Sequence, residues 1–287
     1  MFVLGEVLLS QEGTTQGDPL AMAMYALVIV PLMKVVHTPD ALQIWFADDA
    51  SAGGRLRALR SWWDKLSSKG PLFGYNANAL KTWLLVKQDR LAEAGKIFEG
   101  SGVQITTEGR RCLGFVIGTP TFGEEFVGAE VGRWVKEIEL LAKIACSYPQ
   151  TAFAALTHGM VGRWVYLSCT TPGSPPAYLV LQKAIRNILL PAMLSRPSPG
   201  DDEWELLALP IRFGGLGIPA SVTICREEEK VSQAVTVPWV EKIKSQKFAI
   251  GTVLDDVATA KVAAAHSKRE AIKCCVANVL EKQPPLL

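Results

Sequence analysis

Two aspartates, Asp48 and Asp49, stand side by side in the stretch IWFADDASAGG. The apolar run before them is typical of a buried strand, and the small residues after them permit a tight reversal of the chain. Adjacent carboxylates repel each other, so we expect a compensating positive charge beside them. The pair therefore either caps the helix that begins near Gly54 or holds a cation.

The cation in question is Mg²⁺, for which carboxylate oxygens are suitable ligands. Magnesium keeps several waters, so one or two carboxylates together with substrate phosphates suffice to bind it. Two such ions about 3.5–4 Å apart stabilise both the attacking and the leaving oxygen in nucleotidyl transfer. An acidic pair alone is a weak motif because acidic residues also begin many helices. On these residues alone, both interpretations stay open.

Three more short motifs accompany FADD, residues 46–49, in the first 118 residues. Upstream, EGTTQGDPLAMAMY contains a glutamine-glycine-x-proline motif at residues 16–19, followed by an apolar helical pattern. Downstream, NALKT spans Asn78–Thr82, and CLGFVI spans Cys112–Ile117. In this order and at these spacings, the four motifs resemble those of reverse transcriptases from non-LTR (LINE-like) retroelements.

The resemblance implies catalytic roles for three residues. Asp48 would be the direct ligand of Mg²⁺, or of Mn²⁺ in its place, and Asp49 would lie nearer the primer end. Lys81 would neutralise the triphosphate or act as general acid toward the pyrophosphate leaving group. The alternative for Lys81 is an ordinary solvated lysine.

The resemblance also implies binding roles, with an RNA or DNA template, its primer and a dNTP as partners of the complete enzyme. A glycine allows close backbone approach to a nucleotide, and a glutamine side chain offers both a donor and an acceptor. The nucleotide- and template-binding positions are Gln16, Gly17, Pro19 and Phe46, and the primer grip is Leu113, Gly114 and Phe115.

The chain departs from the family's pattern upstream of the glutamine-glycine motif. The family has a further aspartate on an earlier strand, several tens of residues before that motif, whereas only 15 residues precede Gln16 here. Glu6 and Glu12 are the only acids in that stretch. We therefore expect the C-terminal part of a larger polymerase, inactive by itself.

The predicted fold class is α+β. Strands are expected at residues 2–9, on both sides of the aspartate pair, at TWLLV and at RCLGFVIG, and helical apolar spacing dominates after Gly118. We predict a partial polymerase palm, an antiparallel sheet with helices on one face, over residues 1–118. An all-helical thumb-like region over 119–200 and a C-terminal helical extension over 201–287 follow it.

Charge is unevenly distributed along the chain, although its net charge is only +2. Residues 141–200 contain no Asp or Glu, which leaves a local excess of cations that can attract phosphate. An ordinary helical surface with few acids is the equal alternative. The cations of this stretch are Lys143, Arg163, Lys183, Arg186 and Arg196.

Other features limit the classes of protein to consider. The six cysteines form no CxxC pair and the three histidines stand far apart, which disfavours a zinc site and favours a reduced, intracellular protein of nucleus or cytoplasm. No secretory signal follows Met1. The most apolar run, Pro19–Met33, is short for a membrane span, so we expect a buried helix and no membrane partner.

Three functions remain open from the sequence. The first is a fragment of an RNA-directed DNA polymerase that uses two-metal nucleotidyl transfer in its complete form. The second is a non-enzymatic remnant that binds nucleic acid through its helices. The third is an unrelated two-metal nucleotidyltransferase.

Overall fold

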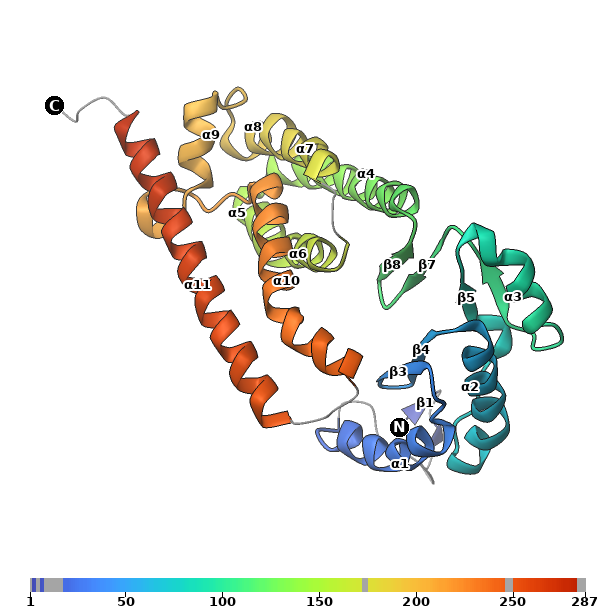
Figure 1. Cartoon of the computed structure of the whole chain (residues 1–287). Helices are drawn as coiled ribbons and strands as arrows, with labels where there is room; N and C mark the ends of the chain where they lie inside the picture. The colour runs from blue at the N-terminus through green and yellow to red at the C-terminus, as the bar shows by residue number, and fades with distance from the viewer. Residues whose placement is uncertain (1, 4–5, 8–17, 172–174, 246–249, 283–287) are drawn as a thin grey trace. The chain divides into compact units, whose positions relative to one another are not determined.

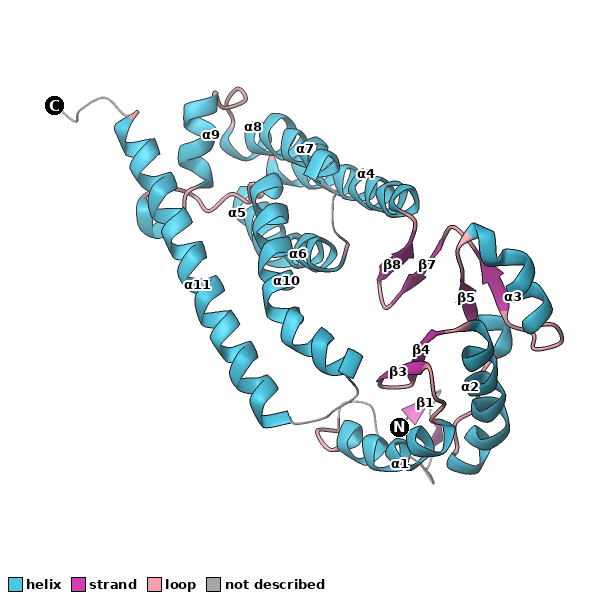
Figure 2. Cartoon of the chain, viewed as in Figure 1, coloured by secondary structure: helices cyan, strands magenta, loops and turns pink. Residues whose placement is uncertain are grey.

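Helices and short paired strands make up the chain, as a computed structural model shows (Figure 1). The structure describes residues 2–3, 6–7, 18–171, 175–245 and 250–282. The chain divides into two units, Met1–Thr107 and Glu108–Leu287. The predicted α+β class is confirmed, with the strands concentrated in the first 118 residues (Figure 2).

The first unit alternates helices with strand pairs. Its helices are α1 (Ala21–Val36), α2 (Leu56–Lys69) and α3 (Leu91–Ile97), with short helical turns η1 (Gly70–Phe73), η2 (Ala79–Lys81) and η3 (Gln88–Arg90). Its strands are β1 (Phe2–Val3), β2 (Glu6–Val7), β3 (Ala41–Phe46), β4 (Asp49–Gly54), β5 (Trp83–Leu85) and β6 (Gln104–Thr106).

The strands of the described residues pair two by two and form no larger sheet. β3 pairs with β4 in antiparallel fashion, whereas β5 and β6 are parallel. The single strand predicted over residues 2–9 is wrong, because β1 and β2 are separate and pair antiparallel with each other. Short local pairing leaves most of the packing in this unit to its helices.

The core of the first unit lies where α1 and α2 meet. Leu32 and Val36 of α1 are fully buried, one helical turn apart, and α2 contributes Trp62, Trp63 and Leu66. This spacing is that of an amphipathic helix face. The two helices therefore provide the platform against which β3 and β4 pack.

Helix α1 is buried on one face only, so the expectation of a buried helix is correct for that face alone. Leu27 is 75% exposed, and Met22, Met24 and Val28 are exposed with it. The described elements that pack on α1 cover the opposite face, at Ile29, Leu32 and Val36. Among the described residues, no helix combines the length and the apolar content that crossing a membrane requires.

The second unit is helical apart from one hairpin at its start. The hairpin consists of β7 (Gly109–Cys112) and β8 (Phe115–Gly118). The helices are α4 (Pro120–Ala145), α5 (Pro149–Ala154), α6 (Val161–Thr170), α7 (Pro175–Ala184), α8 (Leu190–Leu194), α9 (Asp201–Ala208), α10 (Ser221–Ser245) and α11 (Ile250–Glu281). Helical turns η4 (Ala155–Met160), η5 (Ile185–Leu189) and η6 (Ile211–Phe213) join some of them.

The core of the second unit is built around α4. Val127, Val131, Trp134 and Ile138 recur at helical spacing on its buried face. Trp164 of α6 lies 6.3 Å from Trp134 between ring centroids. Helix α10 packs against α6 and α7 and also against α11, which runs alongside it (Figure 1). The helices after residue 200 thus join the same unit as those before it.

The division between the units lies before the β7–β8 hairpin, whereas the sequence placed a boundary near residue 119. The backbone N–H of Thr119 donates to the carbonyl of Glu108 (2.7 Å), which closes the hairpin at the start of α4. The Thr119 hydroxyl also accepts from the Phe122 N–H (3.3 Å) as the cap of that helix. The hairpin is therefore continuous with the helical unit that follows.

Candidate functional site

Asp48 and Asp49 lie at the tip of the β3–β4 hairpin, as predicted. Phe46 and Asp49 are paired across the strands, so Ala47 and Asp48 form a two-residue turn. Ala47 has a φ of 51°, a conformation that costs energy for a residue with a side chain. Both carboxylates are exposed. The turn therefore presents them to solvent at the end of a rigid strand pair.

A tyrosine hydroxyl fixes the tip of this hairpin. Tyr75 donates its O–H to the backbone carbonyl of Asp48 (2.9 Å). Its ring packs edge-to-face on Trp45 of β3, with 5.3 Å between the ring centroids. The Tyr75 N–H donates to the Gly70 carbonyl (3.0 Å), which ties this residue to the end of α2. No motif in the sequence pointed to Tyr75.

Gln43 holds the middle of β3 against both helices. Its side-chain amide donates to the carbonyl of Met33 in α1 (2.8 Å). Its carbonyl oxygen accepts from the indole N–H of Trp45 (3.2 Å) and from that of Trp62 in α2 (3.3 Å). A glutamine oxygen has two lone pairs, and these two hydrogen bonds use both of them. The hairpin is thereby fixed to α1 and α2 through one side chain.

The charges of the two aspartates reach α1. Burial raises the pKa of the Tyr25 phenol, and the negative charges of Asp48 and Asp49 raise it further. Burial likewise raises the pKa of Tyr75, with smaller contributions from the same carboxylates. The helix that follows the glutamine-glycine-x-proline motif therefore lies within electrostatic reach of the aspartate pair. Tyr25 ends the EGTTQGDPLAMAMY stretch, but no role was predicted for it or for Tyr75.

The pair has the donors for Mg²⁺ but few additional ligands. No described residue forms an ion pair with the side chain of Asp48 or Asp49. Within residues 18–171, 175–245 and 250–282 and the two short strands before them, no group of three or more His, Cys, Asp or Glu side chains could hold a metal ion. Two exposed carboxylates fit an ion that keeps most of its waters.

The positions predicted to contact nucleotide and template are only partly described. Gln16 and Gly17 lie outside the described residues. Pro19 is exposed just before α1, and the Asp18 carboxylate accepts from the Leu20 N–H (2.8 Å) at the start of that helix. Phe46 is 65% exposed at the end of β3. Its ring is thus free to contact a ligand beside the aspartates.

Lys81 ends the short turn η2, and two other residues of the NALKT motif stabilise that turn. Asn78 caps η2, with its side-chain oxygen accepting from the Lys81 N–H (3.3 Å). Thr82, at the end of the motif, donates its hydroxyl to the Asn78 carbonyl (2.8 Å). The Lys81 side chain is exposed. Asn78 and Thr82 therefore shape the backbone, and Lys81 is left for solvent or for a ligand.

The predicted primer grip forms a second tight hairpin, in the other unit. Leu113 and Gly114 are the two turn residues between Cys112 and Phe115, with φ of 48° and 85°. Positive φ at both positions is typical of a type I′ hairpin turn. The Tyr166 hydroxyl of α6 donates to the Leu113 carbonyl. Leu113 is exposed at the tip, as a supporting apolar turn requires.

The cation excess expected in residues 141–200 is largely neutralised by tertiary contacts. Arg163 donates to Glu137 of α4 (3.0 Å for the Nη1–Oε1 bond), and this contact lowers the pKa of that carboxyl. Arg186 pairs with Asp201 (2.7 Å). Arg196 pairs with Glu203. All three acids lie outside the acid-free stretch, so only Lys143 and Lys183 stay exposed without a described partner.

The LPIRFGGLGIP segment, residues 209–219, has a local structural role. Gly214 and Gly217 have φ of 85° and 63°, so the chain turns twice after η6. Leu216 and Ile218 both donate their N–H to the carbonyl of Leu207 (3.1 Å each). The segment therefore folds back on the end of α9.

Comparisons with known proteins add no relative. No family model matches the chain, and neither a curated protein nor a solved structure matches it.

Proposed function

We propose that this chain is the C-terminal part of a reverse transcriptase of the non-LTR retroelement type. The observation that carries the proposal is the aspartate hairpin: two exposed carboxylates at the tip of a rigid strand pair, within electrostatic reach of the helix that follows the glutamine-glycine-x-proline motif. The NALKT turn and the leucine-glycine hairpin follow in the family's order. Palm and thumb are the corresponding names for residues 1–118 and for residues 119–200.

In the complete enzyme, each residue of the hairpin has a role that its position allows. The Ala47–Asp48 turn holds the Asp48 carboxylate at the tip, and the Tyr75 hydroxyl fixes the backbone of Asp48. Asp48 and Asp49 would hold Mg²⁺ there, and the ion would supply positive charge against the triphosphate. The exposed Phe46 ring lies at the neighbouring position, where it can pack on the nucleotide. Lys81 offers its Nζ proton to the pyrophosphate leaving group.

One hairpin does not complete a two-metal centre. Two ions in register with a hydroxyl and an α-phosphate need carboxylates from more than one strand. A loss of about 1 Å in positioning can cost a hundredfold in rate. We therefore expect this chain alone to bind Mg²⁺ weakly and not to extend a primer.

Primer extension tests the proposal directly. The 287-residue chain and a fusion that adds an upstream segment with the family's aspartate strand are assayed on RNA and DNA templates, with Mg²⁺ and with Mn²⁺. We expect extension by the fusion only, and its loss in Asp48→Asn. Asp256→Asn, an exposed aspartate of α11, is the matched control and should retain activity.

Two results would count against the proposal in different ways. Extension by the unmodified chain would show that a carboxylate of this chain, Glu6 first, completes the site. A fusion that stays inactive, together with salt-sensitive nucleic-acid binding by the chain, would favour the non-enzymatic remnant. Binding of Mn²⁺ provides a readout besides activity: it should broaden the NMR signals of Tyr25 and Tyr75, and Asp48→Asn should reduce that broadening.

A further inference from the structure

The first unit contains an open cleft of about 550 Å³. Neither Asp48 nor Asp49 lines it. The cleft lies where the end of β4, the start of α2, the end of β5 and the start of α3 come together. Its size is within the range of small-molecule and nucleotide sites. It is lined by Gly54, Arg55, Leu56, Arg57, Leu59, Leu84, Leu85, Val86, Lys87, Arg90 and Glu93.

The charged groups of this cleft are four cations and one carboxylate. Arg90 is paired with Glu93 (2.8 Å) and lies 3.8 Å from Asp89. Arg55 lies 3.7 Å from Asp40, with its own side chain 84% exposed. Arg57 and Lys87 have no described partner. The cleft therefore has a net positive charge. The charges of Arg57 and Lys87 are the ones that no described acid compensates.

The first turn of α2 increases the positive potential of the cleft. No side chain caps its first N–H groups, and no acidic residue occupies its first turn. Arg55 and Arg57 instead bring positive charge to the positive end of the helix dipole, an arrangement that destabilises a helix unless an anion is present. A phosphate bound in the cleft would compensate both the side chains and the free N–H groups.

The floor of the cleft is apolar and aliphatic. Among the lining residues, Leu84 of β5 is buried and Leu59 of α2 and Val86 are half-buried, whereas the four cations are exposed and form the rim. No aromatic ring is among the described lining residues, so a base would make van der Waals contact without stacking. Such a floor accommodates a sugar and a base of any identity, whereas the rim selects phosphate.

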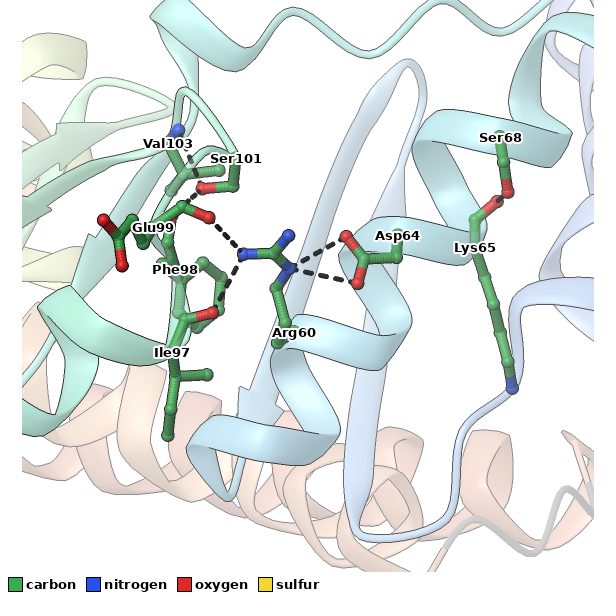
Figure 3. Close-up of polar contacts among 9 residues, drawn as sticks. All are labelled: Arg60, Asp64, Lys65, Ser68, Ile97, Phe98, Glu99, Ser101 and Val103. Carbon is green, nitrogen blue, oxygen red and sulfur yellow. Dashed lines mark hydrogen bonds and ion pairs between the residues drawn. The ribbon is translucent and has the colours of Figure 1, made fainter.

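The walls of the cleft are held together by Arg60, one residue beyond Leu59. Figure 3 shows its guanidinium between α2 and the end of α3. Its Nη1 donates to the carbonyls of Ile97 (2.9 Å) and Glu99 (3.0 Å), and its Nε donates to Asp64 (2.9 Å). Helix α2 is thus fixed to the end of α3. The cleft is therefore formed before any ligand binds.

We infer that this cleft binds the sugar-phosphate backbone of single-stranded nucleic acid, without regard to its sequence. The inference rests on the proposed function for its choice of a polynucleotide over another phosphate compound. Arg57 and Lys87 each contact a phosphate, the first turn of α2 contributes its N–H groups, and one nucleotide lies on the aliphatic floor. The cleft is a second contact with the strand, separate from the carboxylates at the hairpin tip.

Strand binding by the full chain tests the inference. The affinity for labelled oligothymidylate and oligouridylate is measured over a range of salt concentrations for the wild type and for Arg57→Gln/Lys87→Gln. We expect the double variant to bind about tenfold more weakly at low salt, with the salt slope reduced by about 0.7 for each lost phosphate contact. Lys69→Gln/Lys96→Gln removes the same charge from exposed sites of α2 and α3 outside the cleft, and should change affinity less than twofold, about the loss expected from net charge alone.

Two further arms identify the ligand and the site. Inorganic triphosphate tests whether free phosphate is the natural ligand: binding of it that depends on Arg57 and Lys87, with strand binding unchanged in the double variant, would overturn the inference. Amine modification tests the site: bound strand should protect Lys87 and leave Lys69 reactive. Equal affinity of the two double variants for the strand would also overturn it.

The outcome separates this inference from the proposed function. If the polymerase fusion extends primers while the cleft variant binds strand as the wild type does, the cleft has no role and the proposed function stands. If the fusion is inactive while strand binding depends on Arg57 and Lys87, the cleft stands and the polymerase assignment fails.

Discussion

The two tight hairpins of this chain share one construction and differ in chemistry. Each has a two-residue turn with a strained residue, Ala47 in the first and Leu113 in the second, and in each a tyrosine hydroxyl from elsewhere donates to a turn carbonyl. The first presents two carboxylates and the second presents a leucine side chain. The tertiary anchor is thus independent of what the tip displays.

The hairpins also share a base that excludes any side chain. A Cβ on Gly54, at the end of β4, would lie 2.2 Å from the carbonyl oxygen of Asp40. A Cβ on Gly118, at the end of β8, would lie 2.4 Å from that of Glu108. Both neighbours are backbone atoms, which cannot move aside without changing the strand pair. In both hairpins, the tip and the base are each fixed by contacts outside the turn sequence itself.

Substitution of the base glycines should have the largest effect on the two hairpins. We expect Gly54→Ala and Gly118→Ala each to lower the free energy of unfolding of its own unit by about 1–3 kcal/mol, because backbone must move to admit the new methyl group. Gly53→Ala is the matched control, since nothing lies within 4 Å of its added Cβ. Denaturant unfolding combined with hydrogen exchange measures each unit; equal effects of Gly53→Ala and Gly54→Ala would contradict the prediction.

Removal of the tyrosine hydroxyls should have an intermediate effect of the same size in both hairpins. Tyr75→Phe and Tyr166→Phe each remove one hydrogen bond to a turn carbonyl, at a cost of about 1 kcal/mol. Hydrogen exchange at the turn amides should accelerate in the affected hairpin only. Tyr148→Phe, at a tyrosine that is 65% exposed and whose hydroxyl has no described hydrogen bond, provides the baseline. A change confined to one of the two hairpins would break the parallel between them.

The smallest expected effect is electrostatic and belongs to the first hairpin alone. Burial, and then the charges of Asp48 and Asp49, raise the pKa of Tyr25 above its ordinary value. A raised folded-state pKa means that the stability from the neutral phenol is fully present below about pH 10, the unfolded pKa, and is lost as the pH rises through the folded pKa. We expect Asp48→Asn to lower the pKa of Tyr25 slightly, since burial remains.

Phenolate absorbance during a pH titration measures this change, with Tyr25→Phe to assign the signal. Asp256→Asn should leave the Tyr25 pKa where it was. A Tyr25 pKa that Asp48→Asn does not move would mean that the carboxylates lie beyond electrostatic reach of α1.

In the helical unit, the sequence alone did not predict which cations would be paired with acids. Residues 141–200 contain no acid, and that local excess suggested a phosphate-binding surface. The structure pairs Arg163, Arg186 and Arg196 with acids from outside the stretch. The cleft of the first unit shows the reverse: Arg57 and Lys87 are 30 positions apart in the sequence, yet they line one cavity.

Local order in the sequence was sufficient for the tips and for helices α1, α2 and α4. The apolar strand, the pair of aspartates and the small residues after them determined the first hairpin, and helical spacing determined α1, α2 and α4. The same local patterns missed α3 and β6, because the parallel β5–β6 pair joins segments about twenty residues apart and gains its stability only from that pairing.

The tertiary structure alone decided which side chains support the predicted site and which charges remain free. The packing of α1 and α2 around β3 gives Tyr75, Gln43 and Tyr25 their supporting roles. No motif in the sequence assigned these roles, because the contacts exist only in the folded chain. The residue types that can do chemistry are a property of the sequence, since a carboxylate is a metal ligand wherever it lies. Whether such a side chain is anchored, and whether its charge is compensated, depends on its neighbours in space, which only the folded chain brings together.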